Sequence, residues 1–146
     1  MKALIQRVRY ARVEVDQHLI GQIDQGILVF LGVEQQDSKE TVTKMSQKLL
    51  NYRIFSDSQG KMNLSLTDIG GGLLLVSQFT LAADTQSGLR PSFSKAAAPA
   101  LAEELYELML HELRRSHQGQ LASGQFAADM QISLQNDGPV TFLLQC

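Results

Sequence analysis

Apolar and polar residues alternate most clearly at the end of the first predicted element, which covers residues 3–16. There Val13 and Val15 alternate with Arg12 and Glu14, so that one face of the segment is apolar and the other is charged. A period of two indicates a half-buried β-strand. We therefore predict an edge-like strand that contains a bulge.

Two apolar runs follow, at residues 19–23 and 26–33. They are separated by Asp24-Gln25-Gly26, and glycine beside a short polar residue is typical of a hairpin turn. The second run has the sequence ILVFLGV and contains no charged residue. This composition predicts a buried central strand after a hairpin.

Two amphipathic helices are predicted from apolar residues at helical spacing. The first follows Asp37 and Glu40, which have the spacing of a capping box, and its apolar positions are Val42, Met45, Leu49 and Tyr52. The second has Pro99 near its start, and its apolar positions are Leu101, Leu105, Leu108 and Leu113. Each helix has one apolar face with which to cover a sheet.

The remaining strands complete the fold prediction. Gly70-Gly71-Gly72 precedes the apolar strand LLLVSQFTL, and residues 130–134 and 140–144 flank a segment, 136–139, that must turn or bend. We predict one α+β domain over residues 1–146. Its β-sheet is largely antiparallel or mixed, and two amphipathic helices cover it.

Composition agrees with one folded domain of 146 residues, because 44% of the residues are hydrophobic and 19% are charged. Arginines interrupt the N-terminal apolar residues where a signal peptide needs an uninterrupted stretch, and no run has membrane-spanning length. A cytoplasmic location is therefore expected. Cys146 is the single cysteine and a poor candidate nucleophile, since chain ends are usually mobile.

The net charge of -2 does not indicate a nucleic-acid partner for the molecule as a whole. A local basic face remains open, because positive residues gather in two short stretches. These residues are Arg7, Arg9, Arg12, Arg90 and Lys95.

Familiar catalytic motifs are missing from the sequence. It contains no GxSxG, HExxH, P-loop or GxGxxG pattern. None of the histidines His18, His111 and His117 has a good nucleophile beside it in sequence, and we expect them to be surface residues. No cluster of metal-ligating residues appears, so the sequence predicts neither a metal nor a cofactor.

Two segments carry polar or backbone features at positions where a ligand can be reached. Ser77-Gln78-Phe79-Thr80-Leu81 places hydroxyl and amide groups where a strand meets a loop, and an ordinary strand end gives the same pattern. In Asn136-Asp137-Gly138-Pro139-Val140-Thr141, glycine permits close backbone approach, although a plain turn has the same composition. Neither segment is decisive alone.

Taken together, five motifs resemble the D-aminoacyl-tRNA deacylase family in order and spacing over nearly the whole chain. They are Gln6-Arg7-Val8, Gly60-Lys61-Met62-Asn63, SQFTL at 77–81, Arg90-Pro91-Ser92-Phe93 and NDGPVT at 136–141. The pair formed by SQFTL and NDGPVT is far more specific than either alone. One position departs from the family, since Gln125 stands where we expect arginine.

The resemblance implies hydrolysis of the ester bond of D-aminoacyl-tRNA, and clearance of glycine mischarged on non-cognate tRNA. It implies a homodimer in which Gly138-Pro139 of one subunit enters the pocket of the other, with a cis peptide bond held by Arg7. Carbonyls of Gly138 and Pro139 then meet the substrate's α-amino group and exclude the L enantiomer. The tRNA partner is bound through its terminal adenosine.

The catalytic residues expected from the resemblance are Ser77, Gln78, Phe79 and Thr80. Backbone amides around Gln78 and Phe79 are candidates to stabilise the oxyanion. Thr80 is expected to position the substrate rather than attack it, because no base activates its hydroxyl. Phe79 is either a platform near the adenosine or a packed core residue. With no protein base evident, the ribose 2′-hydroxyl is expected to orient or activate the attacking water.

Two other classes of function stay open. A tRNA-binding module without activity accounts for the basic N-terminal stretch, but it leaves the SQFTL and Gly-Pro motifs without a function. A generic esterase would ordinarily show an activated serine or cysteine beside a base. Hydrolysis of charged tRNA would distinguish an enzyme from a binding module. Cleavage of free amino-acid esters much more slowly than charged tRNA would distinguish it from a generic esterase.

Overall fold

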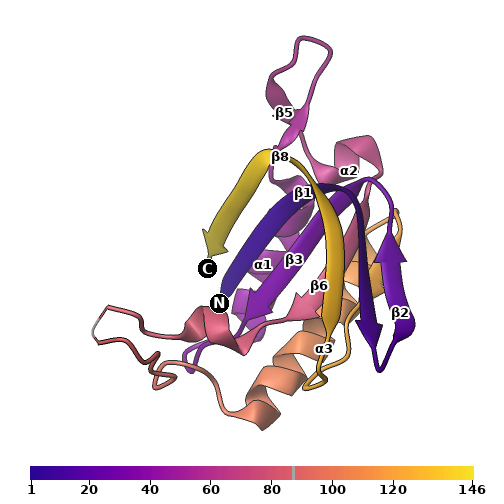
Figure 1. The fold of residues 1–146 in the computed structure, drawn as a ribbon. Helices are drawn as coiled ribbons and strands as arrows, with labels where there is room; N and C mark the ends of the chain where they lie inside the picture. The colour runs from indigo at the N-terminus through magenta and orange to yellow at the C-terminus, as the bar shows by residue number, and fades with distance from the viewer. Residues whose placement is uncertain (87) are drawn as a thin grey trace.

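The computed structural model describes residues 1–86 and 88–146, which form a six-stranded mixed β-sheet with helices packed behind it and a separate two-stranded sheet (Figure 1). In chain order the elements are β1 (Lys2–Val15), β2 (His18–Ile23), β3 (Gly26–Gly32), α1 (Lys39–Asn51), β4 (Phe55–Ser56), β5 (Met62–Leu64), α2 (Leu66–Ile69), β6 (Gly72–Ser77), the 3-10 helix η1 (Phe79–Ala82), α3 (Pro99–Ser116), β7 (Leu121–Ser123) and β8 (Gln131–Gln145).

β1 lies inside the sheet, so the prediction of an edge strand is wrong. It pairs antiparallel with β2 and β3 through one edge and with β8 through the other. The predicted bulge is confirmed, because the register of β1 with β2 shifts between Val13 and Glu14. β1 therefore joins β2 and β3, which follow it in the chain, to β8 at the C-terminal end.

The first hairpin turn lies at Asp16 and Gln17, not at residues 24–26. Val15 pairs with His18, and Asp16 and Gln17 have positive φ angles of 49° and 64°. Two such residues form the two-residue turn that matches the twist of antiparallel strands. Since β2 and β3 follow one another along the same edge of β1, the predicted hairpin at 24–26 is a bend between consecutive strands.

β3 and β6 form the buried centre of the sheet, as predicted for the run that begins at Gly26. They pair in parallel, and β7 pairs in parallel with β6. At one end of this pair Gly26 and Gly72 pack backbone to backbone, and a Cβ on Gly26 would lie 1.8 Å from the carbonyl oxygen of Gly72. Glycine is required at this close approach.

The sheet separates two hydrophobic clusters. One contains Leu73 and Leu75 of β6 together with the buried faces of α1 and α3. The other contains Leu74 and Val76, packed against residues of β1, β2 and β8. Successive β6 side chains point to opposite faces, so one strand supplies both clusters. The prediction of an α+β fold with a mixed sheet and two covering helices is confirmed.

The helix starts are partly as predicted. α3 begins at Pro99, as expected, but the cap of α1 is Ser38 rather than Asp37, and its capping-box partner is Thr41 rather than Glu40. Among residues 1–86 and 88–146, no helix has the length and apolar content needed to cross a membrane.

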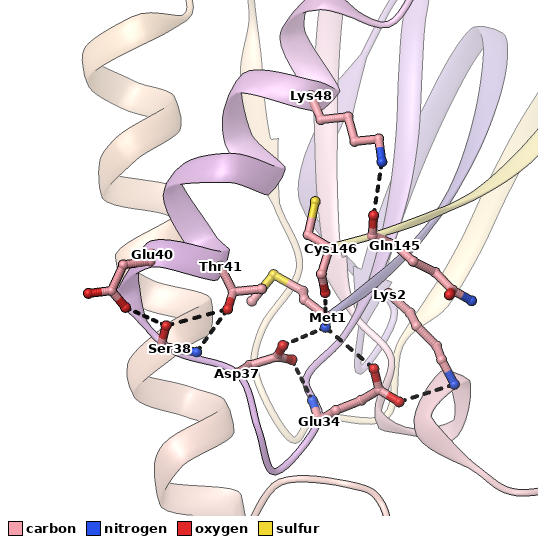
Figure 2. Close-up of polar contacts among 10 residues, drawn as sticks. All are labelled: Met1, Lys2, Glu34, Asp37, Ser38, Glu40, Thr41, Lys48, Gln145 and Cys146. Carbon is pink, nitrogen blue, oxygen red and sulfur yellow. Dashed lines mark hydrogen bonds and ion pairs between the residues drawn. The ribbon is translucent and has the colours of Figure 1, made fainter.

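Asp37 instead binds the N-terminal ammonium group, as Figure 2 shows. The Met1 ammonium also contacts the Glu34 carboxylate at 3.4 Å and the Cys146 carbonyl at 2.9 Å, and the Glu34 amide donates to Asp37 at 2.7 Å. Burial raises the pKa of Glu34, but Lys2 and the ammonium group outweigh it and lower that pKa overall. This network fastens β1, β8 and the start of α1 together.

Candidate active site

The first site segment begins where β6 ends. The backbone amide of Gln78 donates to the carbonyl of Leu31 at 2.7 Å, and the chain then enters η1. The side-chain amide of Gln78 donates to the hydroxyl of Thr80. Phe79 and Thr80 are exposed, and 61% of Phe79 is accessible. The structure thus presents these side chains at the surface, beside a hydrogen-bonded strand end.

A cavity of about 540 Å³ opens beside this segment. Most of its lining is apolar, and Ser77, Gln78 and Asp129 add polar groups. The other lining residues come from β3 and the residue after it, β6, η1, the stretch before α3, α3 itself, the stretch before β8 and the start of β8. They are Leu31, Val33, Val76, Phe79, Ala96, Ala97, Pro99, Ala102, Tyr106, Phe126, Ala127, Ala128, Met130 and Ile132. An apolar cavity with a few polar groups is the usual form of a ligand site.

Tyr106 and Phe126 form a wall of the cavity that the sequence analysis did not identify. The Tyr106 hydroxyl lies 3.1 Å from the Leu75 carbonyl and 3.2 Å from the Gly124 carbonyl, and the two rings are 5.9 Å apart. Burial raises the pKa of the Tyr106 phenol, which therefore stays a neutral donor. These contacts hold the stretch around Phe126 against β6.

The second segment, residues 136–139, bends within β8. Gln6 pairs with Thr141 but Val8 pairs with Asn136, so five steps along β8 face two along β1. The Gly138-Pro139 peptide bond is cis, as the resemblance implied. A Cβ on Gly138 would lie 2.4 Å from the backbone nitrogen of Val140, so a side chain does not fit there. Gly138 and Pro139 are exposed at the outside of the bend.

The side chain of Arg7 binds the backbone of this bend. Its Nε donates to the carbonyl of Asp137 at 2.8 Å and lies 3.3 Å from the Asp137 carboxylate. A second guanidinium nitrogen donates to the carbonyl of Ile54 at 2.7 Å. Only 13% of the Arg7 side chain is exposed. The residue before Gly138 is therefore fixed to both β1 and the stretch that precedes β4.

The two segments lie apart within one chain. Among the residues that the structure describes, those lining the cavity include neither Gly138 nor Pro139. Figure 1 shows the bend of β8 at the end of the sheet beside β4 and β5, whereas η1 follows β6 at the opposite end, near both termini. Ser77, Gln78 and Phe79 line the cavity. Thr80 is connected to it through its hydrogen bond with Gln78. Arg7, Gly138 and Pro139 form a separate group.

The other candidate residues are dispersed. His18 and His111 are exposed as expected, but His117 is buried, with 9% of its surface accessible, which corrects the prediction of a surface residue. The exposed Cys146 lies beside Met1, not at the cavity. Across residues 1–86 and 88–146, no three side chains of His, Cys, Asp or Glu are grouped to hold a metal ion.

The amino-acid sequence matches the family model described as D-Tyr-tRNA(Tyr) deacylase over residues 4–145. The chain belongs to this family. A protein of Pseudomonas putida (strain W619) named D-aminoacyl-tRNA deacylase is 64% identical over 145 residues, which cover 99% of each chain. A protein of the same name from Pseudomonas fluorescens (strain Pf0-1) is 63% identical with the same coverage.

Two solved structures have a similar fold. A protein described as c-Myc DNA Unwinding Element Binding Protein is 39% identical, with a TM-score of 0.95 over 100% of this chain and 99% of its own. A probable eukaryotic D-amino acid tRNA deacylase has a TM-score of 0.86 at 17% identity and covers 98% of this chain and 97% of its own. The second likeness shows the fold alone.

In this member of the deacylase family, four of the five basic residues named from the sequence contact carboxylates. Arg7 and Arg9 both contact Asp137, Arg12 contacts Glu14, and Lys95 contacts Asp84 at 3.0 Å. Gln125 is exposed outside the cavity, in a shallow depression that it shares with Glu103, Glu107 and Arg114. Its departure from arginine therefore does not alter the cavity lining.

Proposed function

We propose that the protein hydrolyses the ester bond of D-aminoacyl-tRNA and releases a D-amino acid and tRNA. The observation that carries this proposal is the apolar cavity at Ser77, Gln78 and Phe79, in a chain whose relatives named D-aminoacyl-tRNA deacylase match it end to end. The cavity accommodates a ligand of nucleoside size. The terminal adenosine of tRNA is such a ligand, and it carries the ester.

The functional unit is a homodimer in which Gly138-Pro139 of one subunit reaches the cavity of the other. Three observations support this arrangement: the segment is exposed, Arg7 binds the carbonyl of the residue before it, and it is not among the described residues that line the cavity of the same chain. In a two-fold dimer one contact of this kind generates its symmetric equivalent. Each active site then contains residues of both subunits.

Chirality is read at the α-carbon of the substrate. The main-chain carbonyls of Gly138 and Pro139 accept hydrogen bonds from the α-amino group, and the remaining space excludes the side chain of an L residue. Because Arg7 fixes the preceding carbonyl, these acceptors are preorganised. Glycine has no side chain to exclude, so glycine mischarged on tRNA is cleared as well.

The chemistry rests on backbone donors and a positioned hydroxyl. The Gln78 amide is already bonded to Leu31, so the oxyanion is stabilised by the amides of Phe79 and Thr80 instead. One well-placed donor is commonly worth about 3 kcal/mol in such a step. Thr80, whose hydroxyl accepts from Gln78, positions the substrate, and the ribose 2′-hydroxyl orients the attacking water.

A complementation experiment tests the shared site. Phe79→Ala damages the cavity and Gly138→Ala damages the inserting segment, so each homodimer should hydrolyse D-tyrosyl-tRNA poorly. The two variants are coexpressed with different C-terminal tags, since the Met1 amine is buried, and the doubly tagged dimer is isolated.

That heterodimer contains one intact site and one site with both lesions. We expect about half of the wild-type rate per dimer. A heterodimer as inactive as the two homodimers would show that each chain uses its own Gly138. A fully active monomer in light scattering would contradict the shared site independently.

A further inference from the structure

Two exposed aromatic rings adjoin at the rim of the cavity. Phe79 and Phe93 have ring centroids 5.1 Å apart and are tilted by 49°, and 61% and 40% of their surfaces are accessible. Phe79 lines the cavity, whereas Phe93 is not among the described residues that do so. Phe93 therefore extends the aromatic surface outward from the cavity.

Backbone contacts on both sides hold Phe93 in place. Before it, Asp84 and Ser92 exchange two hydrogen bonds, of 2.7 and 3.1 Å. After it, the backbone amide of Gln35 donates to the Lys95 carbonyl at 3.1 Å and its side chain donates to the Ser94 carbonyl at 2.8 Å. The ring is thus presented to solvent by a fastened segment, and a fixed exposed aromatic pair is a feature that calls for a binding partner.

We infer that Phe93 stacks on the base of the nucleotide that precedes the terminal adenosine of tRNA. This inference rests on the proposed function. In this arrangement the charged terminal adenosine occupies the cavity of about 540 Å³ and the next nucleotide lies outside it. The tRNA then leaves the cavity past Phe79 and meets Phe93, whose ring adjoins that of Phe79. The tRNA end is single-stranded, and unpaired bases bind by stacking on aromatic side chains, whatever their sequence.

The charge of the same segment fits a nucleotide. Arg90 is exposed and precedes Phe93 by three residues. Contacts of arginine with phosphate position a nucleic acid without reading its sequence. Stacking on Phe93 with a phosphate near Arg90 therefore gives a site for the nucleotide backbone and base together, independent of the identity of the amino acid.

The test compares two substrates in wild type, Phe93→Leu and Phe93→Tyr. One substrate is D-tyrosyl-tRNA, and the other is D-tyrosyl-adenosine, which ends at the terminal nucleoside. We expect Phe93→Leu to raise KM for the tRNA about ten-fold with little change in kcat, and to leave D-tyrosyl-adenosine unaffected. Phe93→Tyr, which keeps a ring, restores the wild-type KM. Leu89→Ala, an exposed apolar change in the same segment, is the matched control and leaves KM unchanged.

Three results would overturn the inference. An equal rise in KM for both substrates in Phe93→Leu would mean that Phe93 acts only by positioning Phe79. An unchanged KM for the tRNA would remove the nucleotide contact. A Phe93→Leu protein that is monomeric in light scattering would assign the ring to the subunit interface.

A binding measurement separates this inference from the proposed activity. Uncharged tRNA should bind Phe93→Leu about ten-fold more weakly than wild type, whereas tRNA without its penultimate base should bind both proteins equally. Equal weakening for both tRNAs would contradict stacking on that base. A wild type that shows the expected binding but no hydrolysis would refute the activity and leave the nucleotide site in place.

Discussion

The guanidinium Nε of Arg7 donates to the main-chain carbonyl of Asp137 at 2.8 Å, in the residue directly before Gly138. A second nitrogen of the same side chain donates to the carbonyl of Ile54, so one partly buried cation joins β1, the bend of β8 and the stretch before β4. Asn136 completes the bend by donating to the carbonyls of Arg7 and Val140. A segment held in this way can present backbone carbonyls to a substrate without rearrangement.

Arg7→Lys should therefore lower kcat/KM for D-tyrosyl-tRNA by about 100-fold, because an ammonium cannot reach both carbonyls in the fork geometry of a guanidinium. Hydrogen bonds from charged donors contribute about 1.5–3 kcal/mol, so stability should fall by a similar amount. Initial rates and urea unfolding measure the two effects. Arg12→Lys is the control, since Arg12 is half exposed and contacts only Glu14 among the described ion pairs. Wild-type kinetics in Arg7→Lys would rule out this role.

Thr80→Ala should reduce the rate about ten-fold without an acyl-enzyme, because its hydroxyl accepts a hydrogen bond from the side-chain amide of Gln78, which is not a base. Cys146→Ala should leave the rate unchanged. Mass spectrometry of the wild-type protein, quenched during turnover, is the check. An aminoacyl adduct on Thr80 would reverse the assignment and make Thr80 the nucleophile.

A substrate without the free 2′-hydroxyl on its terminal adenosine should bind normally and be cleaved about 100-fold more slowly or worse, since a positioned acid-base group is lost. Single-turnover rates with D-aminoacyl-tRNA ending in 2′-deoxyadenosine measure this directly. A normal rate would place the catalytic group on the protein. Thr80 and Asp129, which lines the cavity, would then be tested by substitution.

His117 should make stability depend on pH. Burial lowers the pKa of His117 in the folded protein, although the backbone of Gln120 and Gly71 opposes this. The unfolded chain then takes up a proton near pH 6.5 that the folded chain does not, so stability is full above that pH and is lost as pH falls further. Urea unfolding at fixed protein concentration should show this loss between about pH 7 and pH 5. His117→Gln should reduce the slope, and the exposed His111→Gln should not. An identical slope in His117→Gln would assign the loss to other groups.

Local patterns in the sequence were sufficient for the long strands and the two long helices, but not for the short elements β4, β5, α2, η1 and β7 or for the pairing of the strands. Pro99 and the apolar spacing after it predict α3, because capping and amphipathicity act within a few turns. The central position of β1 depends on β8, which lies at the other end of the chain, and alternation in one strand does not reveal pairing on its second edge. The turn at Asp16 and Gln17 contains no glycine, so it gave a weaker signal than Gly26.

The residues of the candidate site also divide into those that local sequence predicts and those that only the fold brings together. Ser77, Gln78 and Phe79 are adjacent in sequence and could be proposed from their motif, and the structure places them together at the cavity. Tyr106 and Phe126 join the same cavity only through the packing of α3 against β6 and β7, which no spacing in the sequence encodes. The surroundings of His117 likewise include a contact between distant residues, since its ring bonds to the backbone of Gly71.

The most direct test of the proposed activity is hydrolysis of D-tyrosyl-tRNA and L-tyrosyl-tRNA by the purified protein under identical conditions. The fixed carbonyls of Gly138 and Pro139 predict cleavage of the D ester at a rate at least about 100-fold above that of the L ester, since an interaction difference of about 3 kcal/mol at the α-carbon suffices. D-phenylalanyl-tRNA and D-aspartyl-tRNA should also be cleaved. Binding of both tyrosyl-tRNAs without turnover would identify a binding module, and cleavage of both enantiomers at similar rates would contradict chiral selection outright.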